Sequence, residues 1–149
     1  MEHVERFYQA VKNEMAATLA TSADGVVTMR LISPVEYDGA VLLFTDASSN
    51  KYAQLKQNPR CCLSVGGFFL QAEAEFFGPT MLDKNAAMRE VYDAKFPGAF
   101  AEGIAFGGRN AEFILLRPIK LSGWAFLDDI PTADGIPNLP FEITMDTRN

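Results

Sequence analysis

A turn rich in hydroxyl side chains, followed at once by a lysine, is the stretch of this sequence best suited to bind an anion. An apolar run from Ala40 to Phe44 is typical of a strand, and it leads directly into this turn. The hydroxyl groups belong to Thr45, Ser48 and Ser49. The helix expected over Asn50–Gln57 then presents free backbone N–H groups and the positive end of its dipole, and Lys51 adds a full charge. Together these groups predict a phosphate-binding turn.

The same residues also permit a purely structural interpretation. Serine is among the preferred residues at the start of a helix, where its side chain caps a backbone N–H group. Ser48 or Ser49 could therefore serve only as the cap, and Lys51 would then be a solvated surface residue. The local pattern leaves both interpretations open.

The charge and composition of the 149-residue chain limit its partners. Hydrophobic residues make up 48% of the chain, and the net charge is −6, with the acidic residues scattered and no basic stripe. This composition is typical of one globular domain, and it disfavours nucleic acid and anionic membranes as partners. No secretion signal is recognisable and no apolar run is long enough to span a bilayer, so we expect a cytoplasmic protein without membrane contact.

The residues that most often bind metals or act as acid–base catalysts are scarce. Cys61 and Cys62 are adjacent on an expected strand, so their side chains point to opposite faces, and no CxxC pattern is present. His3 is the only histidine. We therefore expect no metal site and no Ser-His-Asp triad, and the sequence identifies no catalytic residue.

Periodicity and turn residues predict the elements that position the hydroxyl-rich turn. Apolar residues three and four apart predict an amphipathic helix over Glu2–Met15. Two strand-like runs joined by Asp24-Gly25 predict a hairpin, and Asn58-Pro59 ends the helix that begins near Ser49. In chain order, the expected strands are Ala16–Ala23, Val26–Ser33, Ala40–Phe44, Arg60–Val65, Phe68–Phe77, Ala111–Arg117 and Ile119–Phe126.

The second half of the chain adds one long helix and two less regular segments. The helix is expected over Leu82–Phe96, where Pro97-Gly98 ends it, and a glycine-rich loop is expected over Phe100–Arg109. Residues 128–149 show little periodicity and are expected to form an extended tail. The pattern predicts a mainly β (α+β) fold over residues 1–127, an antiparallel barrel with helices at its rim.

Several short motifs, in a fixed order, resemble a known family. They are Leu19-Ala20-Thr21, Met29-Arg30-Leu31-Ile32, Phe44-Thr45, Ser49-Asn50-Lys51-Tyr52 and Leu55-Lys56-Gln57-Asn58-Pro59-Arg60. Their order and spacing resemble those of the pyridoxamine 5′-phosphate oxidase-like family of FMN-binding split barrels, over about residues 1–127. The resemblance implies a six-stranded split barrel that forms a homodimer, with FMN held in two clefts at the subunit interface.

The resemblance also assigns residues to the cofactor. It implies that Arg30 and the following Leu31 and Ile32 contact the flavin and its phosphate, as do Phe44 and Thr45 at a strand end. Ser49 and Lys51 correspond to the serine and lysine of the family's phosphate turn. Asn50 stands in this turn where the family oxidase has an arginine, and Val35 stands where it has a lysine. Gln71, on the fifth strand, corresponds to a glutamine that reaches toward the isoalloxazine.

The implied function is that of an FMN-dependent oxidoreductase, which transfers hydride or electrons to a small-molecule substrate from a donor such as a nicotinamide. Pro118–Trp124 lacks the arginine and histidine with which the family oxidase holds its substrate, so we expect a different substrate. Three alternatives remain open. The chain could bind flavin or carry electrons without turnover, it could bind haem or a deazaflavin, or it could be a dimer without a cofactor.

Overall fold

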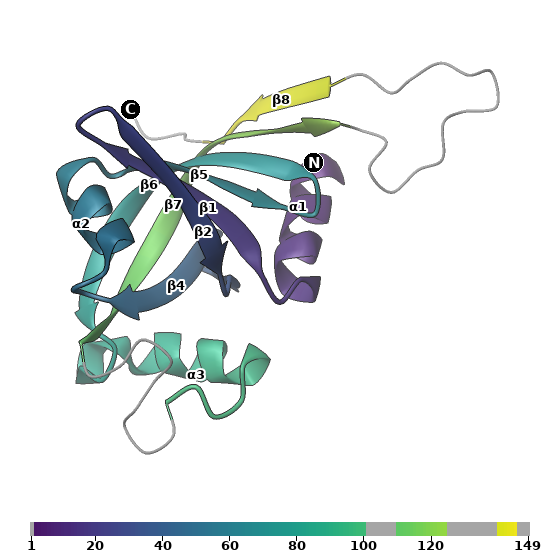
Figure 1. Ribbon diagram of the computed structural model, residues 1–149. Coiled ribbons are helices and arrows are strands. Elements are labelled where there is room, and N and C mark those ends of the chain that lie inside the picture. The colour runs from purple at the N-terminus through teal and green to yellow at the C-terminus, as the bar shows by residue number, and fades with distance from the viewer. Residues whose placement is uncertain (1, 101–109, 125–139, 146–149) are drawn as a thin grey trace, which may run out of the picture.

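One antiparallel sheet of eight strands organises the part of the chain that the structure describes, residues 2–100, 110–124 and 140–145 (Figure 1). The structure is a computed structural model. The strands are β1 (Ala17–Ala23), β2 (Val26–Ile32), β3 (Val35–Tyr37), β4 (Ala40–Asp46), β5 (Arg60–Val65), β6 (Phe68–Pro79), β7 (Ala111–Trp124) and β8 (Pro140–Thr144). The helices are α1 (Glu2–Asn13), α2 (Asn50–Gln57), the short 3₁₀ helix η1 (Asp83–Asn85) and α3 (Ala86–Lys95).

The strands of the sheet follow the order β2-β1-β5-β6-β7-β4-β3, with β8 paired to β7. Tight turns set the register of its hairpins. Every strand pair is antiparallel. Asp24 and Gly25, between β1 and β2, have φ angles of 51° and 78°, and Asp38 and Gly39, between β3 and β4, have 51° and 70°. A two-residue hairpin turn needs positive φ at both positions, which Asp-Gly tolerates well. The predicted Asp24-Gly25 turn is therefore confirmed, and Asp38-Gly39 forms a second turn of the same kind.

The predicted fold class, a mainly β (α+β) split barrel with flanking helices, is confirmed by this arrangement. One correction concerns β7, which is a single strand where the sequence predicts two, Ala111–Arg117 and Ile119–Phe126. Gln71 of β6 pairs with Lys120 and the next residue, Ala72, pairs with Pro118, so the ladder shifts at this point. Because proline has no N–H to donate, the shift lets β7 pass Pro118 without ending.

The helix predicted over Leu82–Phe96 begins later than predicted. Leu82 itself is extended, η1 follows it, and α3 proper starts at Ala86. The buried side chain of Asn85 donates two hydrogen bonds, of 3.0 and 2.9 Å, to the carbonyl groups of Phe77 and Pro79. These bonds tie the 3₁₀ turn to the end of β6, which favours the tighter turn at this point.

Two short strands, β3 and β8, are not predicted from the sequence. The strand β8 falls within residues 128–149, for which an extended tail is predicted, and it pairs with β7 so that Thr144 lies opposite Lys120. Phe141, Ile143 and Met145 alternate with polar residues, which is a strand pattern that the prediction of an extended tail overlooked. Residues 101–109, which form most of the predicted glycine-rich loop, and residues 125–139 and 146–149 lie outside the described residues. The boundary of the domain at residue 127 stays a prediction.

Two clusters of buried apolar side chains fix the helices against the sheet. The first holds α1 and α2 through Phe7, Val11 and Leu55, all of which are fully buried. The second holds α3 through Met88 and Tyr92. Figure 1 shows the result: α2 and α1 lie at opposite sides of the barrel, and α3 lies beyond β4. The end of β4 is thereby placed between α2 and α3.

Candidate functional site

A pocket opens where the ends of β2 and β4 meet α2 and α3. Its volume is about 190 Å³. The lining residues are Leu31, Ile32, Ser33, Phe44, Thr45, Lys51 and Tyr92. Apolar and aromatic side chains form one part of the wall, and a hydroxyl and an ammonium group form another. The pocket therefore suits a molecule with a flat apolar part and an anionic part.

The structure brings together most of the residues that the resemblance assigns to a cofactor. Five of the nine line the pocket, namely Leu31, Ile32, Phe44, Thr45 and Lys51. Two more adjoin it. Ser49 is one of them, because its hydroxyl oxygen is 3.2 Å from that of Thr45. Arg30 is the other, because its charge lowers the pKa of Lys51. Three separate stretches of sequence thus meet at one place.

Ser49 caps α2 and also lies beside the pocket. Its Oγ accepts a hydrogen bond of 3.3 Å from the backbone N–H of Tyr52, which is the geometry of a helix N-cap. The neighbouring Ser48 donates from both its backbone N–H and its hydroxyl to the carboxylate of Asp46, at 2.7 and 2.6 Å. These bonds lower the pKa of Asp46. Of the two serines, Ser49 is the cap and Ser48 holds the turn.

Arg30 is held by three hydrogen bonds on the inner side of the β1–β2 hairpin. Its Nη1 donates to the carbonyl of Leu19 at 3.1 Å and to Oγ1 of Thr21 at 2.7 Å, and its Nη2 donates to Oγ1 of Thr28. A guanidinium group has five N–H bonds, so two remain for another acceptor. Burial lowers the pKa of Arg30, but an arginine side chain stays charged at neutral pH.

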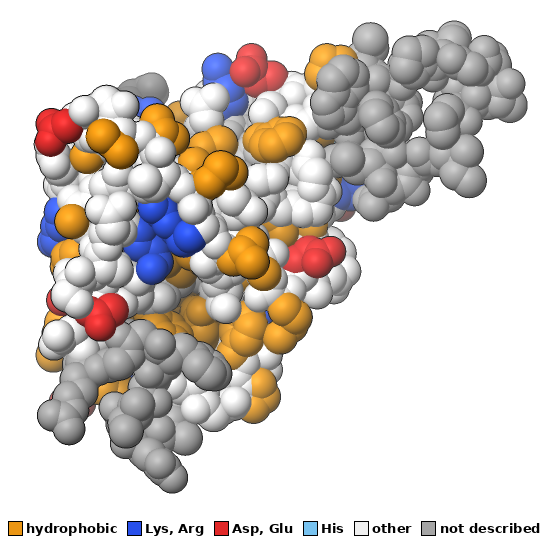
Figure 2. Space-filling view, in the orientation of Figure 1, with side chains coloured by type: hydrophobic (Ala, Val, Ile, Leu, Met, Phe, Trp, Pro, Cys, Tyr) orange, Lys and Arg blue, Asp and Glu red, His pale blue; other side chains and the backbone are white. Residues whose placement is uncertain are grey.

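Lys51 carries the second positive charge at the pocket. Burial lowers its pKa, and the nearby charge of Arg30 lowers it further, against a smaller opposing influence of Asp46. Neither Lys51 nor Arg30 forms an ion pair with any residue that the structure describes. Figure 2 shows Lys and Arg side chains gathered on the surface between α2 and the β1–β2 hairpin. Two like charges near one another, with no ion pair to a described residue, favour the binding of an anion.

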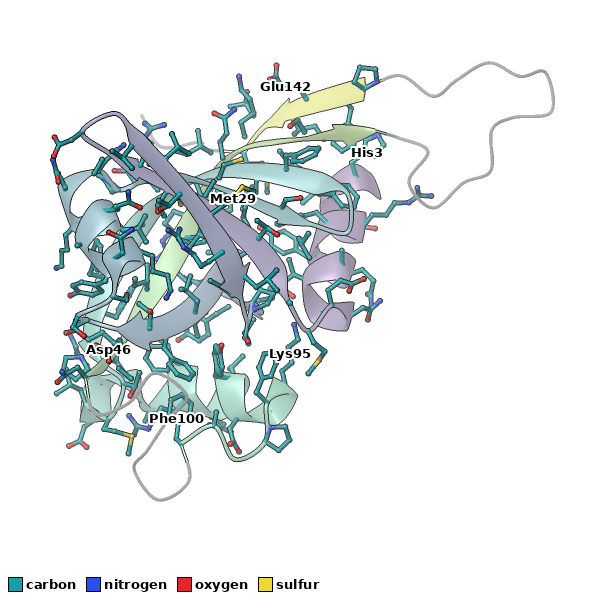
Figure 3. The ribbon with its side chains drawn as sticks, in the orientation of Figure 1. His3, Met29, Asp46, Lys95, Phe100 and Glu142 are labelled. Atoms are coloured by element: carbon teal, nitrogen blue, oxygen red, sulfur yellow. The ribbon has the colours of Figure 1, made fainter. Side chains whose placement is uncertain are left out.

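An aromatic cluster supports the other side of the pocket. Phe44 lies 4.9 Å from the ring of Tyr92 and 5.3 Å from that of Phe100, measured between ring centroids. Figure 3 shows Phe100 among the side chains between β4 and α3. The phenol of Tyr92 donates a hydrogen bond of 2.6 Å to the carbonyl of Ser33. This bond joins α3 to the chain just after β2 and fixes the shape of the aromatic wall.

The last two of the nine predicted site residues, Asn50 and Gln71, are also absent from the lining of the pocket in a single chain. Asn50 is exposed at the start of α2, outside the lining. Gln71 is exposed on β6, where it pairs with Cys62 of β5 and Lys120 of β7. The assignment of these two residues to a cofactor stays a prediction.

Sequence reasoning missed three residues that shape the site: Ser33, Gln54 and Tyr92. Tyr92 lies on the buried face of a predicted helix, so its position alone indicates only a core residue. Gln54 is a polar residue next to the fully buried Leu55, and it is itself only 6% exposed. A glutamine on the inner face of a short helix is a signal that could have been noticed, because buried polar side chains need partners.

The fold is a split barrel, and its pocket lies between strand ends and helices, with a lysine among the residues that line it. The family model for pyridoxamine 5′-phosphate oxidase matches residues 3–104, which is more than half of the chain. The protein belongs to this family of split barrels. A comparison with curated proteins gave no match.

Solved structures with the same fold differ widely in sequence. A haem-binding protein from Mycobacterium smegmatis has a TM-score of 0.68 at 16% identity, with 95% of this chain and 57% of that one covered. A FAD-binding protein from Mesorhizobium loti has a TM-score of 0.61 at 15% identity, with coverages of 77% and 88%. General stress protein 26 from Bacillus anthracis has a TM-score of 0.60 at 13% identity, with coverages of 81% and 92%. At such identities the likeness concerns the fold alone.

The described residues contain no group of three or more His, Cys, Asp or Glu side chains placed to hold a metal ion. Within the same residues, no helix is long and apolar enough to cross a membrane.

Proposed function

We propose that the pocket binds FMN and that the protein is an FMN-dependent oxidoreductase. The observation that carries this proposal is the pair of cations, Arg30 and Lys51, which form no ion pair with a described residue and adjoin two hydroxyl groups. A phosphate group is well matched by a guanidinium, an ammonium and hydroxyl donors together. The hydroxyl groups are those of Thr45 and Ser49, so the donor set fits the phosphate of FMN.

The same pocket offers a suitable wall to a flat ring system. Leu31, Ile32, Phe44 and Tyr92 supply apolar surface next to the cations. When bound, the isoalloxazine of FMN supplies hydride or electron transfer to a small molecule, from a donor such as a nicotinamide. The protein's part is to hold the phosphate, orient the ring and exclude water from one side of it. Among the described residues that line the pocket there is no carboxylate or imidazole, and we assign no side chain to acid–base catalysis.

We further propose that the protein acts as a homodimer. Val27, Met29 and Leu31 project from one face of β2 and are 70%, 68% and 71% exposed in the single chain. Such a strip of exposed apolar side chains is typical of an interface. The register of the strands carries this face across β1 and β5 to Phe69 and Gln71 of β6. Figure 2 shows hydrophobic side chains spread over the same side of the molecule.

The size of the pocket supports the same assembly. Pockets for small ligands commonly measure about 300–1,000 Å³, whereas the pocket of one chain measures about 190 Å³. Leu31 belongs to both the pocket and the exposed face, so a second copy docked there would extend the wall. Gln71 lies on the same face, and in a dimer it would approach the cofactor of the other subunit.

The flavin proposal is tested first by the visible absorption spectrum of the purified protein and by titration with FMN while its fluorescence is followed. We expect saturable quenching that is strongly weakened in Lys51→Ala, because that variant loses one of the two cations. Lys84→Ala is the matched control. Lys84 is exposed on η1, so this substitution removes the same charge away from the pocket. Absence of a bound chromophore together with absence of saturable binding would contradict the proposal.

Reduction by a nicotinamide donor separates an oxidoreductase from a protein that only carries flavin. We expect the absorption of the FMN-loaded protein to bleach with the donor and to return with an electron acceptor. A loaded protein that stays oxidised with every nicotinamide donor would favour the carrier alternative. A titration with a deazaflavin in place of FMN tests whether the same pocket binds that cofactor.

Haem is the second candidate cofactor, because a haem-binding protein is among the similar folds. His3, the only histidine of the sequence, lies on α1 and stacks on Phe141 of β8, with the ring centroids 4.0 Å apart. This contact keeps it away from the pocket, so a histidine-ligated haem is less well supported than FMN. Titration with haemin, in the wild type and in His3→Ala, tests this alternative directly.

A further inference from the structure

We infer that Gln54 is a positioning residue that aims the guanidinium of Arg30 at the phosphate of the bound ligand. This inference rests on the proposed function, and it concerns residues that do not themselves line the pocket. Gln54 reaches Arg30 only through the hydroxyl groups of Thr21 and Thr28. The four side chains come from three elements, namely α2, β1 and β2.

The directions of the hydrogen bonds in this group are fixed by its chemistry. A guanidinium can only donate, so the hydroxyl oxygens of Thr21 and Thr28 must accept from Arg30. Each hydroxyl then has one proton left to donate. Both protons go to Oε1 of Gln54, at 2.5 Å from Thr21 and 2.6 Å from Thr28. One amide oxygen therefore orients both hydroxyl groups toward the arginine.

The amide of Gln54 is itself held in one orientation. Its Nε2 donates to the carbonyl of Val26 at 3.3 Å, so the oxygen must point toward the two threonines. Gln54 and Thr21 are buried, at 6% and 2% exposure, and the described residues leave no buried side-chain polar atom without a partner. A fully satisfied buried network of this kind holds its members rigidly.

The neutrality of the amide matters as much as its geometry. A carboxylate at this position would accept the same two hydroxyl hydrogen bonds. It would also place a negative charge near Arg30, with only a threonine hydroxyl between the two groups. The amide supplies the acceptor without that charge, so the guanidinium stays unneutralised. The two N–H bonds that Arg30 retains are therefore available to a ligand together with its full charge.

The consequence is a specificity for a ligand that carries a phosphate. Gln54 acts on the part of the ligand that Arg30 contacts and not on the flat ring. Loss of the amide should therefore weaken the binding of FMN more than the binding of riboflavin, which has the same ring without the phosphate. If Gln54 only stabilised the fold, its substitution would weaken the binding of both ligands equally.

The test is the ratio of the Kd for riboflavin to the Kd for FMN, measured by quenching of flavin fluorescence. We expect Gln54→Met to lower this ratio about tenfold, which corresponds to the loss of one well-placed charge-assisted hydrogen bond. Gln54→Glu should lower the ratio as well, because it neutralises the arginine. The matched control is Gln57→Met, which makes the same change at an exposed position of the same helix and should leave the ratio unchanged.

A double-mutant cycle decides whether Gln54 acts through Arg30. In an Arg30→Ala background, Gln54→Met should change the ratio no further, because residues that act as a unit are not additive. If Gln54→Met fails to fold, Thr28→Val takes its place in the cycle, since Thr28 is only half-buried and also bonds to Arg30.

The possible results separate this inference from the proposed function. A wild-type protein that binds FMN, with the ratio unchanged in Gln54→Met, overturns the positioning role and leaves the FMN site standing. An equal fall in the ratio in both backgrounds also overturns it, because Gln54 would then act independently of Arg30. A wild-type protein that binds neither flavin overturns both proposals.

Discussion

Lys51 and Arg30 are two positive charges that lie close enough to influence one another in a protein whose net charge is −6. Each is partly removed from water, and neither has an ionic partner among the described residues. Such an arrangement is unfavourable for the folded chain itself. Residues kept at a cost to stability are characteristic of functional sites.

At the scale of single residues we therefore predict that Lys51→Met stabilises the protein in the absence of a ligand while it weakens FMN binding. The gain should be below about 1 kcal/mol, because solvent screens a half-exposed charge. The measurement is urea denaturation of both proteins at neutral pH and low salt. Lys84→Met serves as the control, and a flavin-free Lys51→Met that is less stable than the wild type would contradict the prediction.

The pH dependence of this effect has a definite sign. Because the folded state lowers the pKa of Lys51, the unfolded state binds more protons between that lowered pKa and the ordinary value of 10.5. The stability that Lys51 removes is therefore recovered as the pH rises through this window. The difference between wild type and Lys51→Met should shrink toward pH 10.5, and a constant difference would count against an electrostatic cause.

The sequence predicts the residues of the pocket better than the network behind them. Thr45, Ser49 and Lys51 follow one another along a strand, a turn and a helix, so local pattern alone brings them together. Tyr92 and Gln54 act through partners distant in the chain, Ser33 and the threonines of the β1–β2 hairpin. No periodicity specifies such contacts, because they depend on how whole elements pack.

At the scale of elements, one lysine joins α3 to the end of α1 and to the segment that follows β2. Nζ of Lys95, at the end of α3, donates to the carbonyl groups of Val11, Glu14 and Pro34, each at 2.6 Å. Val11 and Glu14 lie at the end of α1, where carbonyl groups lack partners within the helix. Pro34 follows the pocket residue Ser33. Lys95 therefore fixes α1 and α3 relative to the end of β2.

We predict that Lys95→Met destabilises the protein by about 2 kcal/mol, because it removes a charged donor shared by three carbonyl groups. The measurement is the midpoint of urea denaturation. Lys84→Met again controls for the loss of a lysine and should change stability by less than about 0.5 kcal/mol, as exposed substitutions usually do. Equal effects of the two substitutions would show that the three contacts contribute nothing.

The elements themselves differ in how well the sequence predicts them. The bounds of α2 are confirmed at both ends, since Ser49 caps one end and the pair Asn58-Pro59 stops the other. The pairing of β8 with β7 and the continuity of β7 past Pro118 could not be predicted in the same way. Both depend on a neighbouring strand, which supplies hydrogen bonds that the local sequence does not encode.

At the scale of the whole molecule, the exposed apolar face of β2 continues over the neighbouring strands. Phe69 extends that apolar face on β6, where it is 44% exposed. Met29 lies near the centre of the face, opposite Ala20 of β1, and Leu31 continues from it into the pocket. A second copy placed on this face would bury these side chains and enclose each pocket more fully. Assembly and cofactor binding should then depend on each other.

We predict that the wild-type protein sediments as a dimer and that Met29→Glu sediments as a monomer, because two buried carboxylates would face each other across the interface. Analytical ultracentrifugation measures the change. Met81→Glu is the matched control, since Met81 is 54% exposed but lies beyond the end of β6, outside this face. The monomeric variant should also bind FMN at least about tenfold more weakly, because a wall of its pocket is missing. A wild-type monomer with full FMN affinity would show that one chain forms the complete site, and it would move the role of Gln71 out of the cofactor site.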